Sequence, residues 1–220
     1  MAPIDSREVR IMPSGLEGSL TIPTEAAAVV VFAHGSGSSR RSPRNVYVAA
    51  ALQKAGFATL LFDLLTAAEE RSREKVFDIP LLASRLLETT EWIKRQKPDW
   101  PLGYFGASTG AAAALVAGAS NQQVGAIVSR GGRPDLAANA LERVMAPTLL
   151  IVGGNDEIVI ELNRQAYARL RCEKKLTIVP GATHLFEEPG TLDEVVRLAT
   201  QWFTKHLAAA NSGARSNHVH

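Results

Sequence analysis

A serine between two glycines is the clearest chemical signal in this sequence. The segment 106–110 reads Gly-Ala-Ser-Thr-Gly, after an apolar run at 102–105 and before an alanine-rich run at 111–117. On a sharp turn between a strand and a helix, a serine exposes its hydroxyl and the residues two positions away must be small. The N-terminus of the following helix also favours negative charge that develops at this point. The pattern predicts a nucleophile at Ser108, although glycine-flanked serines also form ordinary helix-capping turns.

A serine nucleophile needs a base, and histidine is the side chain suited to that work at neutral pH. Of the five histidines, only His34 and His184 follow apolar runs that we expect to be strands. His34 opens a glycine-rich loop, which gives that position another role. His184 comes after the run 176–179 through a Pro-Gly-Ala-Thr turn. We therefore predict that His184 is the base, the alternative being a loop histidine that bonds to nearby backbone.

The imidazole in turn needs a carboxylate that orients it and stabilises its positive form. Asp156 follows the predicted strand 148–152 through a Gly-Gly-Asn turn, one helix and one strand before His184. Their strands should be neighbours, so both side chains should emerge at one edge of the sheet. An Asx turn or a helix N-cap before Ile158 is the alternative role for Asp156, and the two roles are compatible. The chain order Ser108, Asp156, His184 is that of the α/β-hydrolases.

Acyl transfer also requires donors for the oxyanion that forms on the attacked carbonyl. The backbone N–H of Thr109, directly after the nucleophile, is one candidate. We predict the backbone N–H of Ser36 as the second, because Gly35 and Gly37 let this loop approach closely. A glycine-rich loop after a strand could instead bind phosphate, but neither a P-loop nor a dinucleotide-binding pattern is present.

Strands and helices alternate along most of the sequence. This alternation predicts a mostly parallel sheet with helices on both faces, in which ligands bind at the C-terminal ends of the strands. A hairpin of two short strands at the sheet edge precedes it. The predicted strands are 8–12, 16–22, 27–33, 57–62, 102–105, 124–129, 148–152 and 176–179. The predicted helices are 45–54, 79–97, 111–118, 134–144, 160–171 and 191–207, with a polar segment at 66–75.

Composition narrows the class of protein. The 220 residues suit a single α/β domain, which we expect over 1–210 with a flexible tail over 211–220. The net charge of +2 and scattered basic residues do not indicate a nucleic-acid partner, and we expect none. One cysteine excludes an intrachain disulfide and a cysteine metal cluster, so no metal is expected. Without an apolar stretch of signal-peptide or membrane-helix length, we expect a cytoplasmic protein with no membrane partner.

Together these motifs resemble the α/β-hydrolases, and within them the dienelactone hydrolase-like group. The resemblance extends from His34-Gly35 through the Ser108 motif and Asp156 to His184. It implies an eight-stranded mostly parallel sheet, ester hydrolysis and no cofactor. Dienelactone hydrolases carry a cysteine at the position of Ser108, so a general serine carboxylesterase is favoured.

Other readings of the same residues stay open. An acyltransferase, a thioesterase or a peptidase would use the same three residues, and a non-catalytic binding module could keep the fold. The chain could be a monomer or a homodimer.

The sequence also suggests what surrounds the nucleophile. Only the stretch 130–147 lies where many esterases insert a cap, so no cap domain is expected and the pocket should be open, suiting short or activated esters. Leu64, Thr66 and Phe186 lie in loops at the active edge and could line the pocket, or could simply pack there.

Two arginines could bind an acidic substrate. Arg130 follows a strand end, and Arg40 lies in the loop that carries Ser36. Either could form a bidentate contact with a substrate carboxylate. We favour the alternative, a structural salt bridge to Asp63, Glu69 or Asp135.

Overall fold

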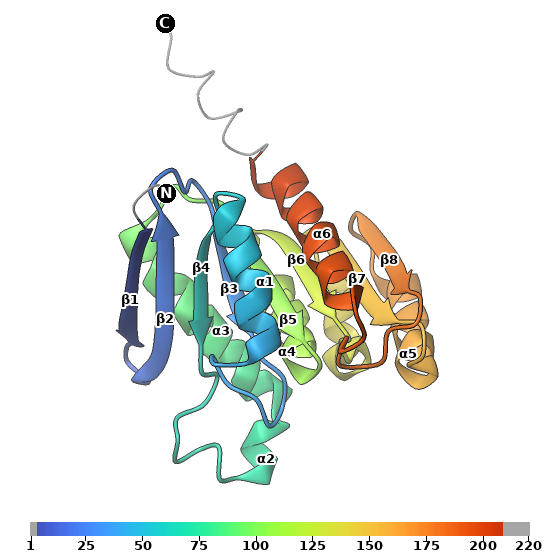
Figure 1. Cartoon of the computed structure of the whole chain (residues 1–220). Coiled ribbons are helices and arrows are strands. Elements are labelled where there is room, and N and C mark those ends of the chain that lie inside the picture. Colours follow the sequence, from blue (N-terminus) through green and yellow to red (C-terminus); the bar gives the residue numbers. More distant parts are fainter. Residues whose placement is uncertain (1–3, 209–220) are drawn as a thin grey trace, which may run out of the picture.

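A single twisted sheet organises the computed structural model, which describes residues 4–208 (Figure 1). Its strand order is β1-β2-β4-β3-β5-β6-β7-β8, and all neighbouring pairs from β4 to β8 are parallel. The hairpin β1–β2 joins antiparallel at one edge, as predicted. The strands are β1 (Ile4–Ile11), β2 (Leu16–Pro23), β3 (Val29–Ala33), β4 (Ala58–Phe62), β5 (Leu102–Ala107), β6 (Val124–Arg130), β7 (Thr148–Gly153) and β8 (Lys174–Val179).

The central strands are buried on both faces, because helices cover both sides of the sheet. Alternate residues of β3 show the two cores: Val29 and Val31 belong to one apolar cluster, whereas Val30 and Phe32 belong to the other. All five residues of β3 and of β4 are buried. Continuous apolar runs therefore predicted these strands correctly.

Helices α1 and α6 cover one face of the sheet, and α3, α4 and α5 cover the other (Figure 1). The order of the elements is the alternation that the sequence predicts. The helices are α1 (Pro43–Lys54), α2 (Arg73–Val76), α3 (Ile79–Gln96), α4 (Thr109–Ser120), α5 (Glu157–Arg169) and α6 (Thr191–Phe203). A 3₁₀ segment, η1 (Pro134–Arg143), and a final π-helical turn, η2 (Thr204–Ala208), complete the described chain.

Three helices begin earlier than predicted. The hydroxyl of Ser42 accepts a hydrogen bond from the backbone N–H of Asn45, and Pro43 takes the first helical position, so α1 starts before Asn45. Serine as N-cap followed by proline is a favourable helix start. α4 begins at Thr109, directly after the Ser108 turn, and α5 begins at Glu157, directly after Asp156, without a side-chain capping hydrogen bond. The apolar pattern marks the buried face of a helix, whereas these starts depend on the turn that precedes each helix.

Two connections also differ from the prediction. The polar segment 66–75 contains most of the short helix α2, whose N-cap is Ser72. The stretch predicted as a helix at 134–144 is 3₁₀ and is interrupted at Ala138, which has a φ of 43°. Because only η1 connects β6 to β7, the described chain has no cap domain. The predicted tail at 211–220 lies outside the described residues.

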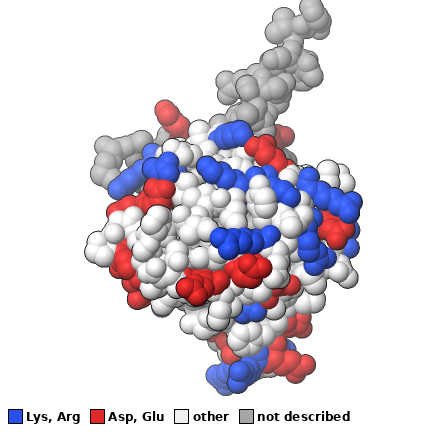
Figure 2. All heavy atoms as spheres, turned by 90° about the vertical axis from the view of Figure 1, so that its right-hand side faces the viewer, with Lys and Arg blue, Asp and Glu red and all other residues white. Residues whose placement is uncertain are grey.

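Charged side chains of both signs share the face that carries β8 and α5. Figure 2 shows Lys and Arg interspersed there with Asp and Glu. Ion pairs such as Arg171–Glu142 and Lys205–Glu173 join some of them. Over residues 4–208, no helix combines the length and the apolar character needed to cross a membrane.

Candidate active site

Ser108 lies on a strained turn between β5 and α4. Its φ is 49° and its ψ is −121°, a backbone conformation that non-glycine residues rarely adopt. The turn is held in place by neighbouring backbone, because the N–H of Ser108 donates to the carbonyl of Arg130 and its own carbonyl accepts from Arg133. Strain that the surrounding structure maintains is typical of functional sites.

The two glycines of the motif are required by close backbone approach. A Cβ atom at Gly106 would lie 2.5 Å from the Cα atom of Ala111. At Gly110 it would lie 2.2 Å from the carbonyl oxygen of Ala33 and 2.4 Å from that of His34. The predicted reason for small residues on both sides of Ser108 is therefore confirmed.

Asp156 and His184 form a hydrogen-bonded pair next to this turn. The Nδ1 atom of His184 lies 2.6 Å from the Oδ2 atom of Asp156. The strands that precede them, β7 and β8, are paired as predicted. Asp156 occupies the N-cap position of α5, but its side chain makes no capping hydrogen bond. Its carboxylate therefore serves the imidazole, which leaves the opposite ring nitrogen of His184 available as a base.

A cavity of about 240 Å³ brings Ser108 and His184 together. We call it the Ser108 cavity. Ser108 and His184 form no hydrogen bond with each other in this structure, and such contacts often tighten only when substrate binds. The other described lining residues are Gly35, Ser36, Ser38, Ser42, Arg44, Asn45, Ala107, Arg130 and Leu185.

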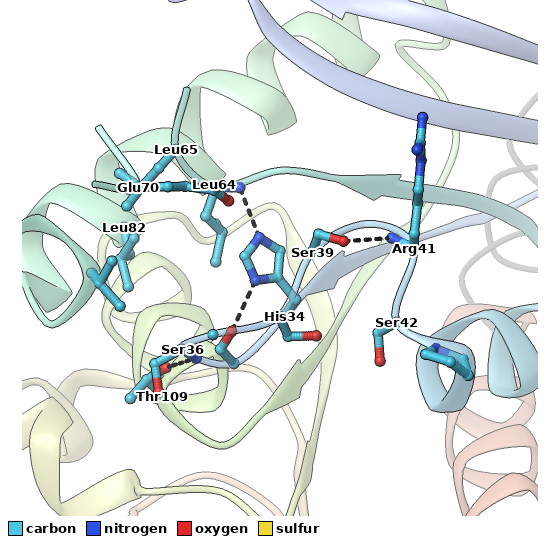
Figure 3. Close-up of a pocket in the computed structure, with 15 residues that line it drawn as sticks. His34, Ser36, Ser39, Arg41, Ser42, Leu64, Leu65, Glu70, Leu82 and Thr109 are labelled. Atoms are coloured by element: carbon cyan, nitrogen blue, oxygen red, sulfur yellow. Dashed lines mark hydrogen bonds between the residues drawn. The ribbon is translucent and has the colours of Figure 1, made fainter. Parts of the chain in front are cut away.

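The two predicted oxyanion donors lie against each other. The backbone N–H of Ser36 donates to the Oγ1 atom of Thr109 at 2.8 Å (Figure 3). The N–H of Thr109 belongs to the first turn of α4, where backbone donors lack partners within the helix. The backbone N–H of Thr109 can therefore donate to an oxyanion. The N–H of Ser36 instead donates to the Thr109 hydroxyl in this structure.

His34 holds the loop that carries Ser36. Its Nε2 atom accepts a hydrogen bond from the backbone N–H of Leu64 at 3.1 Å, and its Nδ1 atom lies 3.0 Å from the carbonyl of Gly35. A ring that accepts at Nε2 and donates at Nδ1 is neutral. Burial lowers the pKa of His34, which favours this neutral form.

A second cavity, of about 460 Å³, lies beside His34 and shares Gly35, Ser36, Ser38 and Ser42 with the Ser108 cavity (Figure 3). We call it the His34 cavity. Leu64, one of the predicted lining residues, lies on its wall. Its other apolar lining residues are Pro43, Leu65, Val76 and Leu82.

Comparison with known proteins agrees with this geometry. A family model described as an alpha/beta hydrolase domain matches residues 26–208.

The chain belongs to the α/β-hydrolase family.

Individual relatives make the likeness more specific. The crystal structure of dienelactone hydrolase from Anabaena variabilis is 54% identical, with a TM-score of 0.89, over 93% of this chain and 98% of that one. The esterase domain of a Rhodothermus marinus protein shares the fold, with 19% identity and a TM-score of 0.73 over 93% and 99% of the two chains. A protein of Mycobacterium tuberculosis, provisionally named a phosphoribosyl transferase, is 60% identical over 211 residues, 93% of this chain. The chain spans about half, 47%, of that relative's length.

Arg130 differs from the expectation for this α/β-hydrolase. It is only 6% exposed and forms no salt bridge with Asp63, Glu69 or Asp135 or with any other carboxylate of the described residues. Its Nη2 atom donates to Oδ1 of Asn45 at 3.2 Å. Burial, together with the charge of Arg44, lowers the pKa of Arg130 to about 10, so the group stays cationic at neutral pH. The predicted structural salt bridge is therefore wrong for Arg130.

The salt-bridge alternative is correct for Arg40. Its guanidinium bonds to Asp63 and lies 2.9 Å from Glu17, which accounts for its charge. Arg40 lines a neighbouring hollow that also contains Thr66, and it does not line the Ser108 cavity.

Phe186 is likewise placed away from the cavities. It is 2% exposed and packs in the core beside α6, with its ring 6.0 Å from the guanidinium carbon of Arg130. The side chain supports the Arg130 position from beneath, so the prediction that it lines the pocket is corrected.

Three residues at the site were missed by sequence reasoning. Asn45, taken as a helix start, is buried and its side chain faces Arg130. Arg44 and Leu185 also line the Ser108 cavity. A buried asparagine looks like a capping residue in a sequence, and only the tertiary neighbours show its partner. Within residues 4–208, no three His, Cys, Asp or Glu side chains are grouped closely enough to hold a metal ion.

Proposed function

We propose that this α/β-hydrolase is a serine carboxylesterase that acts on small esters. The observation that carries the proposal is the 2.6 Å Asp156–His184 hydrogen bond at the cavity into which the strained Ser108 turn opens. A nucleophile, an oriented base and a preorganised backbone turn are the parts that acyl transfer needs.

The mechanism follows from the positions of these groups. The Oγ atom of Ser108 attacks the ester carbonyl, and His184 takes the hydroxyl proton. Asp156 orients the imidazole and stabilises its positive form. His184 then gives the proton to the departing alcohol, which leaves an acyl group on Ser108. Water, deprotonated by His184, attacks this acyl-enzyme and releases the acid and the serine hydroxyl.

The oxyanion requires donors in both tetrahedral steps. The N–H of Thr109 is one, and we propose that the N–H of Ser36 becomes the other when substrate displaces its bond to the Thr109 hydroxyl. Rotation of one side chain is enough to free this amide. His34 keeps the Ser36 loop in place through Gly35.

The cavities suggest the size of the substrate. The Ser108 cavity, at about 240 Å³, has room for a short acyl chain. The adjoining His34 cavity, with apolar walls of Leu64, Leu65 and Leu82, can receive the other side of the ester. No cap domain in the described chain encloses a long lipid chain, so small or activated esters are the proposed class.

The test is hydrolysis of p-nitrophenyl esters from acetate to palmitate by wild type and Ser108→Ala. We expect turnover of the short esters and a loss of kcat on the order of 10⁴-fold or more in the variant. Ser120→Ala, an exposed position at the other end of α4, is the matched control and should retain activity. Turnover that survives in Ser108→Ala would contradict the assignment.

A fluorophosphonate probe distinguishes a catalytic site from a binding module on the same fold. We expect the probe to label wild type and not Ser108→Ala. An unlabelled wild type would favour the non-catalytic alternative. Addition of dilute alcohols or amines to the ester assay separates a hydrolase from an acyltransferase, because a transferase yields new ester or amide.

The activity in the name of the M. tuberculosis relative, phosphoribosyl transfer, is not carried over to this chain. This chain spans only 47% of that protein's length. The candidate site of this chain contains Ser108, His184 and Asp156, a set of groups suited to acyl transfer. We therefore do not propose phosphoribosyl transfer for this chain.

A further inference from the structure

An arginine without a counter-charge lies in the wall of the Ser108 cavity. Arg130 is 6% exposed, and its only side-chain hydrogen bond within the described residues is the one to the neutral amide of Asn45. Its Nε atom is buried and has no hydrogen-bond partner. Buried charges in proteins are normally paired, because removing an ion from water without a partner is costly.

The nearby carboxylates are already engaged elsewhere. Asp156 is bonded to His184, and Asp135 forms a bidentate pair with Arg133. Glu187 lies 3.1 Å from Arg44 and is exposed to solvent. None of these groups lies within ion-pair distance of Arg130.

The cavity as a whole has a positive character. Its described lining contains two guanidinium groups, those of Arg44 and Arg130, and no carboxylate. The Nε atom of Arg44 is also buried without a hydrogen-bond partner. Arg44 is paired with Glu187, whereas Arg130 has no counter-charge and is repelled by the charge of Arg44. A bound anion would supply that counter-charge and the missing hydrogen-bond acceptors.

We propose that Arg130, assisted by Arg44, binds an anionic group of the substrate, so that the preferred ester carries a carboxylate or a phosphate beside the bond that Ser108 attacks. This inference rests on the proposed esterase function and names its substrate class. Arginine suits the role because its planar fork matches both carboxylate and phosphate oxygens.

A purely structural role for Arg130 makes a different prediction. Its contacts with Asn45 and with the ring of Phe186 would stabilise the fold whatever ester is bound. Loss of such a role would affect all esters alike. A loss of kcat/KM that is confined to anionic esters therefore distinguishes substrate binding from a structural role.

The decisive comparison uses two acyl chains of similar length. p-Nitrophenyl hemiglutarate carries a terminal carboxylate, and p-nitrophenyl pentanoate is its neutral counterpart. We expect wild type to have the higher kcat/KM for the hemiglutarate. Arg130→Met should lower that value about ten- to hundredfold, the range expected for charge-assisted hydrogen bonds, and should change the pentanoate value about twofold or less. Equal losses on both esters would overturn the proposal.

Arg133→Met is the matched control. Arg133 lies three residues from Arg130, but its guanidinium is paired with Asp135 outside the cavity. Its replacement removes the same charge three residues further along the chain, and the ratio of the two kcat/KM values should stay as in wild type. A ratio that falls as far as in Arg130→Met would show a general electrostatic effect and would contradict direct binding.

A second pair of esters, one of which carries a phosphate, identifies which anion is bound. 2-(Butanoyloxy)ethyl phosphate is compared with 2-(butanoyloxy)ethanol by titration of the released acid. If wild type prefers the anionic ester only in this pair, and Arg130→Met loses that preference, the bound group is a phosphate. If the same result is found only for the hemiglutarate pair, the bound group is a carboxylate. No preference for either anion overturns the proposal.

A binding measurement keeps this inference separate from the esterase proposal. In Ser108→Ala, calorimetry should show that the hemiglutarate or the phosphate ester binds at least about ten times more tightly than its neutral counterpart. The preference should disappear in the Ser108→Ala/Arg130→Met double variant. If wild type hydrolyses no ester but this preference is found, the esterase function fails and the anion site stands. If wild type hydrolyses esters but shows no preference for the anionic ones, the esterase function stands and the anion site fails.

Discussion

At the scale of single residues, the site depends on how each polar group is satisfied. Asp156 bonds to His184, whereas its neighbour Glu157 is exposed at the start of α5. Two adjacent carboxylates thus have different surroundings, and only that of Asp156 meets the imidazole. The difference yields a matched test of the role of Asp156.

Asp156→Asn should lower kcat by about 10³- to 10⁴-fold. An amide can still occupy the space, but it cannot stabilise the imidazolium and favours the wrong tautomer of His184. Steady-state hydrolysis of p-nitrophenyl acetate measures the effect. Glu157→Gln removes the neighbouring charge and should leave kcat within about twofold of wild type. Similar losses in both variants would show that general charge, and not the hydrogen bond to His184, is important.

At the scale of elements, the junction of β5 with α4 determines where Ser108, the proposed nucleophile, lies. The helix crosses so close to β3 that Gly110 contacts the carbonyls of Ala33 and His34. The same packing brings the Ser36 loop, which follows β3, next to Thr109. One close approach therefore positions both Ser108, the proposed nucleophile, and the predicted oxyanion donors.

Gly110→Ala should destabilise the protein by about 1–3 kcal/mol, because the added Cβ meets backbone oxygens that cannot move independently. For a domain of this size, this corresponds to a decrease in Tm of roughly 2–12 °C. Esterase activity should fall as well, since the turn would move.

Gly118→Ala, in the same helix, is the control for Gly110→Ala. Its Cβ would meet only the end of the Ile127 side chain, which can change rotamer. Thermal unfolding of both variants should show the smaller decrease in Tm for Gly118→Ala, and the opposite order would contradict the argument.

At the scale of the whole molecule, His34 ties the fold to pH. It connects the loop after β3 to the loop after β4 through Leu64. Burial lowers its pKa from the ordinary value of 6.5, so the unfolded chain binds a proton before the folded protein does. The contribution of neutral His34 is thus fully present above pH 6.5 and is lost as the pH falls from there toward its folded pKa.

We therefore expect the free energy of unfolding to decrease as the pH falls below about 6.5, and to decrease less in His34→Gln. Urea unfolding at a series of pH values measures this difference. The pKa of His206 is also lowered by burial, so His206→Gln serves as the comparison that isolates the share of His34. Identical pH profiles for wild type and His34→Gln would exclude this role.

The sequence by itself determined the class of fold and the identity of the chemical groups. Apolar runs of strand length, alternating with amphipathic helices, allow little besides a two-faced parallel sheet, and such a sheet brings its loops to one edge. The glycines around Ser108 indicated that other backbone segments approach this turn closely, although they did not identify those segments. Element type was therefore predictable, while starts such as Ser42 and the 3₁₀ form of η1 depended on local capping and packing.

Only the tertiary structure decided which polar groups meet. Arg40 and Arg130 look alike in the sequence, each following the end of a strand, but the fold surrounds one with carboxylates and leaves the other facing Asn45. It also buries Phe186 beneath Arg130 and turns the N–H of Ser36 toward Thr109. Such pairings join residues far apart in the chain, and their geometry depends on how helices and loops pack against the sheet, which hydrophobic periodicity does not encode.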